Sequence, residues 1–300
     1  MITAEEMSAV GLGTEYLADD STQDDRMGSR VEKIRRSVQG GVNTLDTSPV
    51  SDQGRSEVAI GNYIDQENRR EDLFLTSKCG FEWDLEDGLT RDLSLERIHQ
   101  ELEESMNRMQ VDVLDLYLLN TVGDDFSFKE SFNSLGKIKN DRNVRNIGLK
   151  RPNEDQLRDA LEITDLDFIQ LPYGLFDRKP FNALEPICTS NEIRIIVTDV
   201  LEERPSWTET SVDEQRNEDN GSGESSEKRL RFVLETYFDR EYPAESMDAL
   251  MARWAVGSPD VHSGILESTE ERGIQTILRV LDINLTRENY RAIDQILGSL

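Results

Sequence analysis

Two cations stand side by side after one apolar segment of an otherwise acidic chain. Lys150 and Arg151 directly follow VRNIGL (144–149), whose leucine and β-branched residues are typical of a buried strand. Cations gathered at the end of a strand attract anions, so the pair is a candidate anion site. The alternative is that nearby carboxylates neutralise the pair, with these candidates: Asp46, Asp199 and Glu267.

The segment that follows the last predicted strand carries the opposite charge. Glu267, Glu270 and Glu271 gather where a helix is predicted to begin, and Arg272 alone offsets them. A helix N-terminus attracts anions through its free N–H groups and its dipole. Carboxylates at this position compete for those donors, so the segment is predicted to cap a helix and to repel a phosphate.

The histidines and cysteines have no metal-ligand spacing. His99 and His262 are far apart in the sequence, and neither Cys79 nor Cys188 belongs to a paired motif. We therefore predict no metal site. Both thiols are expected to be small buried hydrophobes, as suits a reducing cytoplasm.

Eight short apolar segments must position these candidate residues. Their lack of strict alternation is typical of strands that are buried on both faces, as in a parallel sheet. Amphipathic helices are predicted between them, and this repetition favours a single (β/α)8 TIM barrel over residues 1–300. A doubly wound open sheet is the alternative. The predicted strands are 9–14, 42–47, 73–78, 113–119, 144–149, 167–171, 194–199 and 261–266.

Three helices have clear signals in the sequence. Ser94 is a predicted N-cap. It is followed by an apolar stripe made of Leu95, Ile98, Leu102, Met106 and Met109. Ser268 and Glu271 form a predicted capping box, and Thr286 precedes the last helix. Residues 202–227 break this rhythm, because they are acidic and rich in Gly and Ser; they predict a mobile loop inserted after the seventh strand.

One segment carries a resemblance to a known family. DTSPVSDQGRSE (46–57) matches without a gap the pattern D-T-A-x-x-Y-G-x-x-x-S-E, and on this basis the chain resembles the aldo-keto reductases. Segments further along the chain continue the match in the same order, namely 75–84, 91–120, 146–157, 168–178 and, more loosely, 247–265. The resemblance implies a barrel of the kind that reduces carbonyl compounds with NADPH.

The resemblance also implies a catalytic tetrad of Asp, Tyr, Lys and His. The aspartate matches Asp46 and the lysine matches Lys78, but the tyrosine position is Ser51 and the histidine position is Asn120. A serine hydroxyl is far less acidic than a phenol and too short to reach the same point, and asparagine does not titrate. The proton donor and the group that orients the carbonyl are therefore predicted to be lost.

Most cofactor-binding positions implied by the resemblance are replaced as well. Gln170 matches the family's glutamine for the nicotinamide amide, whereas Lys150 and Arg151 stand where the family has Ser-Asn. Thr198 replaces the tyrosine that stacks on the nicotinamide. The phosphate-binding pattern begins at Glu267.

These replacements favour one hypothesis and leave two alternatives. The first is a catalytically inactive protein without a cofactor, which binds an unknown protein partner or a small ligand at the barrel mouth. The second is an oxidoreductase that reduces aldehydes or ketones with NADPH or NADH and an atypical tetrad. The third is an enzyme that forms Schiff bases through Lys78, although Asp46 nearby favours the protonated amine.

The net charge of the chain indicates the salt conditions that suit the protein and the classes of partner that it can bind. The chain has 61 acidic and 34 basic residues, a formal net charge of −27, and few lysines. Salt screens the self-repulsion of such a chain, which favours the cytoplasm of a high-salt organism. Nucleic acid is excluded as a partner because no basic stripe is present. No apolar run reaches membrane-spanning length, and the N-terminal residues do not resemble a secretory signal.

Overall fold

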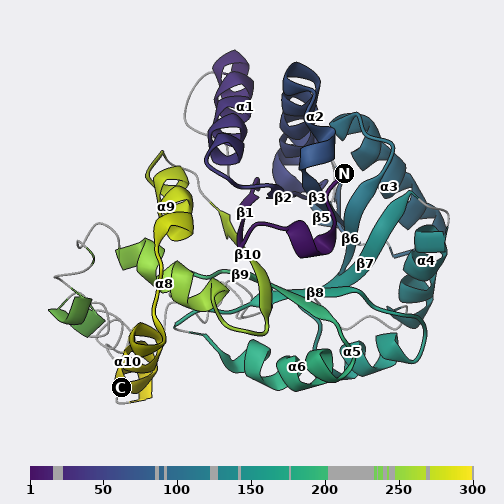
Figure 1. The fold of residues 1–300 in the computed structure, drawn as a ribbon. Helices are drawn as coiled ribbons and strands as arrows, with labels where there is room; N and C mark the ends of the chain where they lie inside the picture. The colour runs from purple at the N-terminus through teal and green to yellow at the C-terminus, as the bar shows by residue number, and fades with distance from the viewer. Residues whose placement is uncertain are drawn as a thin grey trace.

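Parallel strands form a closed ring at the centre of the molecule, and helices surround the ring (Figure 1). The computed structural model describes residues 1–15, 23–84, 88–90, 93–121, 128–140, 143–175, 177–201, 233–234, 236–238, 242, 247–267 and 271–298. The predicted loop at 202–227 and the predicted capping box at Ser268 lie outside these residues.

The ring contains eight strands, in the order β1-β10-β9-β8-β7-β6-β3-β2. Each neighbouring pair is parallel, and Val10 pairs with Gly264 where the ring closes between β1 and β10. All eight predicted strands are confirmed, and the closure rules out the open sheet. The strands are β1 (Val10–Gly13), β2 (Thr44–Asp46), β3 (Phe74–Cys79), β6 (Leu114–Asn120), β7 (Val144–Lys150), β8 (Phe168–Pro172), β9 (Arg194–Thr198) and β10 (Val261–Glu267).

Helices cover the outer face of the ring. They are α1 (Gln23–Gln39), α2 (Arg55–Glu67), α3 (Leu95–Met109), α4 (Phe128–Asn140), α5 (Glu154–Leu161), α6 (Lys179–Ser190), α8 (Met247–Val256), α9 (Glu271–Asp282) and α10 (Arg287–Gly298). Short 3-10 turns are η1 (Ala4–Glu6), η2 (Ser51–Gly54) and η3 (Arg70–Asp72). Ser94 caps α3 as predicted, since its side chain accepts a hydrogen bond from the Arg97 N–H at 3.3 Å. The prediction for Leu95 was wrong: its first-turn position leaves the side chain 40% exposed.

A glycine lets two of these helices approach closely. Gly61 of α2 faces the last turn of α3, where an added Cβ atom would lie 2.6 Å from the carbonyl oxygen of Arg108 and 3.0 Å from Cα of Met109. Any larger residue would force the two backbones apart. This contact fixes α2, and hence the turn that precedes it, against the barrel.

Two small elements were not predicted. Strands β4 (Glu82–Asp84) and β5 (Gly88–Thr90) form an antiparallel hairpin beyond the end of β3. At the opposite end of the ring, the N-terminal turn η1 covers the strand starts (Figure 1). The Asn43 side chain donates to the Glu6 carbonyl at 2.7 Å, and Arg194 pairs with Glu5.

The interior of the barrel is apolar from this N-terminal cover to the middle of the strands. Its side chains come from alternate positions of β3, β6, β8, β9 and β10, since successive residues of a strand face opposite sides. The inner cluster consists of Ala4, Phe74, Leu116, Leu118, Phe168, Ile196 and Ile265. Polar side chains that could take part in a reaction therefore lie at the opposite end of the barrel, at the C-terminal ends of the strands.

The predicted cysteine environments are confirmed: Cys79 and Cys188 are both buried and free. Among the helices that the structure describes, none is long and apolar enough to cross a membrane.

Candidate functional site

Seven strands of the barrel, β2, β3 and β6 to β10, each carry an inward-facing residue at or near their C-terminal end, at the mouth of the barrel. Each stands two residues after an interior position, so strand alternation alone turns its side chain inward. We call this set the mouth ring: Asp46, Lys78, Asn120, Lys150, Gln170, Thr198 and Glu267. The closed barrel thus brings seven predicted site residues together from seven different strands. Active sites of TIM barrels occupy this end of the barrel.

Asp46 connects two members of the mouth ring. Its Oδ2 accepts from Lys78 Nζ at 2.5 Å and its Oδ1 accepts from Gln170 Nε2 at 3.0 Å. All three side chains are buried. Burial by itself lowers the pKa of Lys78, but the charges of Asp46 and Glu15 outweigh it and raise that pKa above its usual value. Lys78 is therefore a permanent ammonium ion.

Glu15 is a member of the site that sequence reasoning missed. It stands two residues after the end of β1, and its Oε1 lies 3.2 Å from Lys78 Nζ and 3.6 Å from Lys150 Nζ. Strands β1 and β7 lie on opposite sides of the ring, so the Glu15–Lys150 pair spans the mouth. Desolvation opposes ionisation of Glu15, but the two lysines lower its pKa to about 2. The signal available in the sequence was a lone carboxylate directly after the small-residue segment VGLGT.

Ser51 begins η2, the turn between β2 and α2. The next three residues, Asp52, Gln53 and Gly54, have φ of 45°, 55° and 79°, a left-handed run that is costly for the two non-glycine residues. Arg30 and Arg55 both pair with Asp52 and hold this turn in place. The Ser51 hydroxyl is buried and has no hydrogen-bond partner within the described parts of the chain.

Asn120 and Thr198 occupy the remaining ring positions. Asn120 ends β6 beside Lys150, its partner in the β6–β7 register. Thr198 is buried, and its hydroxyl donates to Asp199 Oδ2 at 3.2 Å. Neither side chain titrates near neutral pH, so neither supplies a proton to a bound molecule.

A second ion pair lies at the mouth beside Gln170. Arg151 follows β7 and Asp199 follows β9, and their side chains meet at 2.5 Å. Both residues have left-handed backbone, with φ of 55° and 54°. Because β8 separates the two strands, the pair spans the end of β8, which carries Gln170. Arg151 is thus neutralised by Asp199, one of the carboxylates predicted for this role. Lys150 pairs instead with Glu15, which was not predicted.

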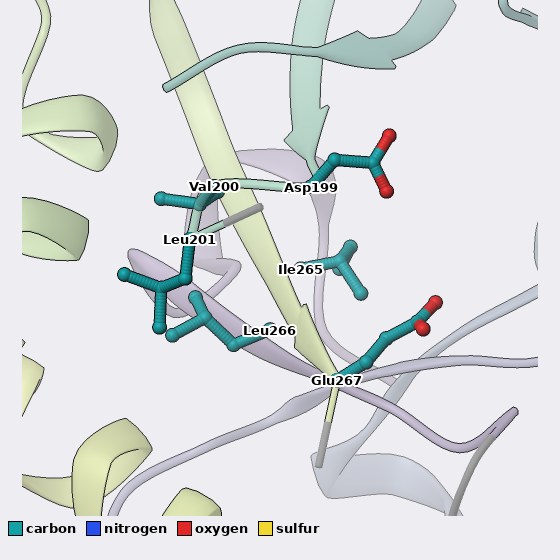
Figure 2. A pocket seen from close by; sticks show the side chains of 6 residues that line it. All are labelled: Asp199, Val200, Leu201, Ile265, Leu266 and Glu267. Atoms are coloured by element: carbon teal, nitrogen blue, oxygen red, sulfur yellow. The ribbon is translucent and has the colours of Figure 1, made fainter. Parts of the chain in front are cut away.

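A small pocket lies between the ends of β9 and β10 (Figure 2). Figure 2 shows the carboxyl groups of Asp199 and Glu267 directed to the same side, with the apolar side chains on the other: Val200, Leu201 and Leu266. An added Cβ atom at Gly13 would lie 2.5 Å from Cγ of Glu267, so only glycine leaves room for this carboxylate beside β1.

Glu267 reaches solvent, yet its ionisation is opposed. Desolvation by the surrounding protein, followed by the negative charge of Glu15, raises its pKa to about 8. Within the described residues it has no ion-pair partner. At neutral pH its carboxyl group therefore holds a proton much of the time.

The residues at one end of the mouth fit the amide of a nicotinamide cofactor. Oε1 of Gln170 is a buried acceptor without a hydrogen-bond partner among the described residues, and an amide N–H would satisfy it. The Glu15–Lys150 and Arg151–Asp199 pairs lie across the mouth and must open before a ring can enter. Asp199 repels phosphate groups, whereas Arg151 attracts them.

Comparison with known proteins places this arrangement in a family. A family model described as "Aldo/keto reductase family" matches residues 9–298. The NADH-specific methylglyoxal reductase of Escherichia coli is 28% identical over 211 residues, which span 66% of this chain and 64% of that protein. Aldo-keto reductase YhdN of Bacillus subtilis is 27% identical over 195 residues, 65% of this chain and 59% of that protein. The matches thus span less than two thirds of either relative.

Solved structures share the fold. A glycerol dehydrogenase of Gluconobacter oxydans superposes with a TM-score of 0.81 at 23% identity, covering 98% of this chain and 92% of that one. An aldo/keto reductase of Klebsiella pneumoniae in complex with NADP and acetate gives 0.69 at 19% identity, covering 97% and 92%. At these identities the likeness demonstrates the (β/α)8 barrel.

Proposed function

Because this chain belongs to the aldo/keto reductase family, we propose that it is a nicotinamide-dependent oxidoreductase that reduces small aldehydes or ketones with an atypical set of residues. The observation that carries this proposal is the buried group in which Asp46 holds Lys78 at 2.5 Å and Gln170 at 3.0 Å. The names of the relatives support it, since they include a methylglyoxal reductase and a glycerol dehydrogenase. This replaces the inactive protein as the leading hypothesis.

The chain's own residues perform three tasks in this reaction. The free acceptor of Gln170 would hold the amide of a nicotinamide, which when bound would supply the hydride. Asp46 keeps Lys78 protonated, and the ammonium stabilises negative charge on the carbonyl oxygen. Of the three hydrogen bonds of Lys78, that to Glu15 is the longest at 3.2 Å, so it is the one that a carbonyl oxygen replaces. Ser51 is a poor acid, so water supplies the proton.

Binding and turnover test the proposal directly. In molar KCl, NADH and NADPH should each be titrated against protein fluorescence, and a panel of aldehydes should be tested for oxidation of the reduced cofactor. We expect binding of at least one cofactor and slow turnover. Lys78→Met should abolish turnover, because it removes the charge that stabilises the oxyanion.

A second lysine provides the matched control. Lys139 pairs with Asp167 at 2.6 Å, at the strand starts and away from the mouth, so Lys139→Met should keep the turnover of the unmodified chain. Failure of both cofactors to bind, together with no turnover, would contradict the oxidoreductase.

That outcome would favour the second candidate, a non-catalytic barrel that binds a partner or a small ligand at its mouth. Two observations favour this candidate. Neither Ser51 nor Asn120 is a proton donor of suitable acidity, and the ion pairs of Glu15 and Asp199 cover the mouth. The same titration distinguishes the two candidates.

The third hypothesis, Schiff-base chemistry at Lys78, has little support. A nucleophilic amine must be neutral, and Asp46 and Glu15 hold the pKa of Lys78 above its usual value. The side chain is also only 3% exposed.

A further inference from the structure

The two lysines of the mouth ring differ in their partners. Lys78 donates to Asp46, Thr47 and Glu15, which uses all three of its N–H groups. Lys150 has one partner within the described residues, Glu15, at 3.6 Å. Its side chain is 16% exposed, compared with 3% for Lys78. Lys150 is therefore the amine at the mouth that an incoming molecule can reach and that few contacts restrain.

We propose that Lys150 is a covalent site for small carbonyl compounds, which condense with its amine to form a Schiff base. Nothing in the reduction reaction uses this amine. The site needs no cofactor, so the inference stands apart from the proposed oxidoreductase and is tested separately.

The electrostatic surroundings of Lys150 favour the neutral, nucleophilic amine. Burial, followed by repulsion from the ammonium of Lys78, lowers its pKa, and Arg151 acts in the same direction. Glu15 and Asp46 oppose this effect without reversing it. The charged groups that face Lys150 come from five places around the mouth: Glu15 after β1, Asp46 on β2, Lys78 on β3, Arg151 after β7, and Glu267 on β10.

The condensation balances without an oxidant or a reductant. The nitrogen lone pair attacks the carbonyl carbon, and a proton passes from nitrogen to oxygen to give a carbinolamine. The hydroxyl group then takes a second proton and leaves as water while the carbon–nitrogen double bond forms. Glu267 is suited to supply that proton, because its pKa is raised to about 8 and its carboxyl group interacts with the charge of Lys150.

Lys150 is not among the residues that line the pocket between the ends of β9 and β10. The walls of that pocket are aliphatic at Val200, Leu201 and Leu266, and its carboxylates belong to Asp199 and Glu267 (Figure 2). The aliphatic side chains point to the opposite side from the two carboxyl groups, so they do not border the mouth where Lys150 lies. The ligand class therefore follows from access to Lys150, whose side chain is 16% exposed: a small aldehyde.

Reductive trapping tests the inference. The protein, without nicotinamide, should be incubated with propionaldehyde and cyanoborohydride, digested, and mapped by mass spectrometry. We expect propyl addition at Lys150 at a pH where Lys129 is unmodified. Lys129 is an internal reference, since it is 57% exposed and Asp159 raises its pKa.

Two variants make the result decisive. Lys150→Arg keeps the positive charge but lacks the amine, and should lose the adduct while retaining the circular dichroism of the folded protein. Glu15→Gln removes a charge that raises the pKa of Lys150, and should move half-maximal labelling to lower pH.

The inference would be overturned if the more exposed Lys129 were modified before Lys150. It would also be overturned if the pH dependence of Lys150 labelling were the same in Glu15→Gln as in the unmodified chain. An adduct without any cofactor-dependent turnover would contradict the oxidoreductase alone. Turnover without an adduct would contradict this inference alone.

Discussion

Ser51 stands in a buried position where the family motif has a phenol, and its hydroxyl is unpartnered among the described residues. If the rest of the mouth is competent, Ser51→Tyr should restore a general acid and raise kcat for aldehydes about 100-fold or more. Ser51→Phe is the control for added bulk. Equal turnover in the two variants would show that proton donation does not limit the reaction.

If a nicotinamide cofactor binds as proposed, we expect the Arg151–Asp199 pair at the mouth to weaken its binding. Asp199→Asn removes a carboxylate from the pocket and breaks its ion pair with Arg151, so both effects should tighten NADPH and NADH binding, by about tenfold or about 1.4 kcal/mol. Fluorescence titration measures this change. Weaker binding in Asp199→Asn would mean that the pair does not obstruct the cofactor.

Glu267 should make stability fall with rising pH. Its pKa is about 8 in the folded chain and near 4.5 in an unfolded one, so its stabilising contribution is complete below pH 4.5 and is lost as pH rises through 8. Glu267→Gln should therefore match the unmodified chain at pH 4.5. It should melt about 1–3 °C higher at pH 9, a small effect because solvent screens the side chain. Glu130→Gln on α4 is the exposed control.

Asp46, Lys78 and Gln170 could be predicted because each matches a position of the aldo-keto reductase motifs that the sequence resembles. Glu15 could not. Its importance arises from a contact with Lys150 across the mouth, between residues 135 positions apart (150 − 15), which exists only in the closed barrel. The pairing of Arg151 with Asp199 likewise depends on left-handed backbone that side-chain patterns do not indicate.

At the scale of elements, Gly61 and Gly28 make a matched pair of helical glycines. Alanine normally stabilises a helix relative to glycine by about 0.5–1 kcal/mol. Gly28→Ala in α1 should show this gain, because nothing lies within 4 Å of the added Cβ atom. Gly61→Ala should instead lose about 1–3 kcal/mol, because its Cβ atom would meet the α3 backbone at 2.6 Å.

Denaturant unfolding of the two variants measures both effects. Stabilisation by Gly61→Ala would show that α2 can move away from α3 at no cost, and that the helix does not hold the Ser51 turn rigidly.

The eight strands could be predicted because, in a chain this polar, a short continuous apolar segment indicates a strand that is buried on both faces. The β4–β5 hairpin and the turn η1 could not. The hairpin strands are three residues each, too short for a periodic signal, and η1 is positioned by tertiary contacts of Glu5 and Glu6 with Arg194 and Asn43.

At the scale of the whole molecule, the net charge of −27 should make folding depend on salt. Raising KCl from about 0.1 M to about 1 M shortens the screening length from about 10 Å to about 3 Å. The melting temperature should rise by about 5 °C or more as self-repulsion is screened. Calorimetry in sucrose of equal osmolality separates screening from crowding, and a rise of the same size in sucrose would contradict this explanation.

The closure of the ring between β1 and β10 also determines when the molecule can be completed during synthesis. Val10 finds its partner only when Gly264 is available, so β1 exposes unpaired backbone groups on this edge until nearly nine tenths of the 300-residue chain has left the ribosome. A nascent chain stalled before β10 would carry two open sheet edges and be prone to misassembly. Joining partners so distant in sequence is slow, so the last step of folding is the one that seals the barrel.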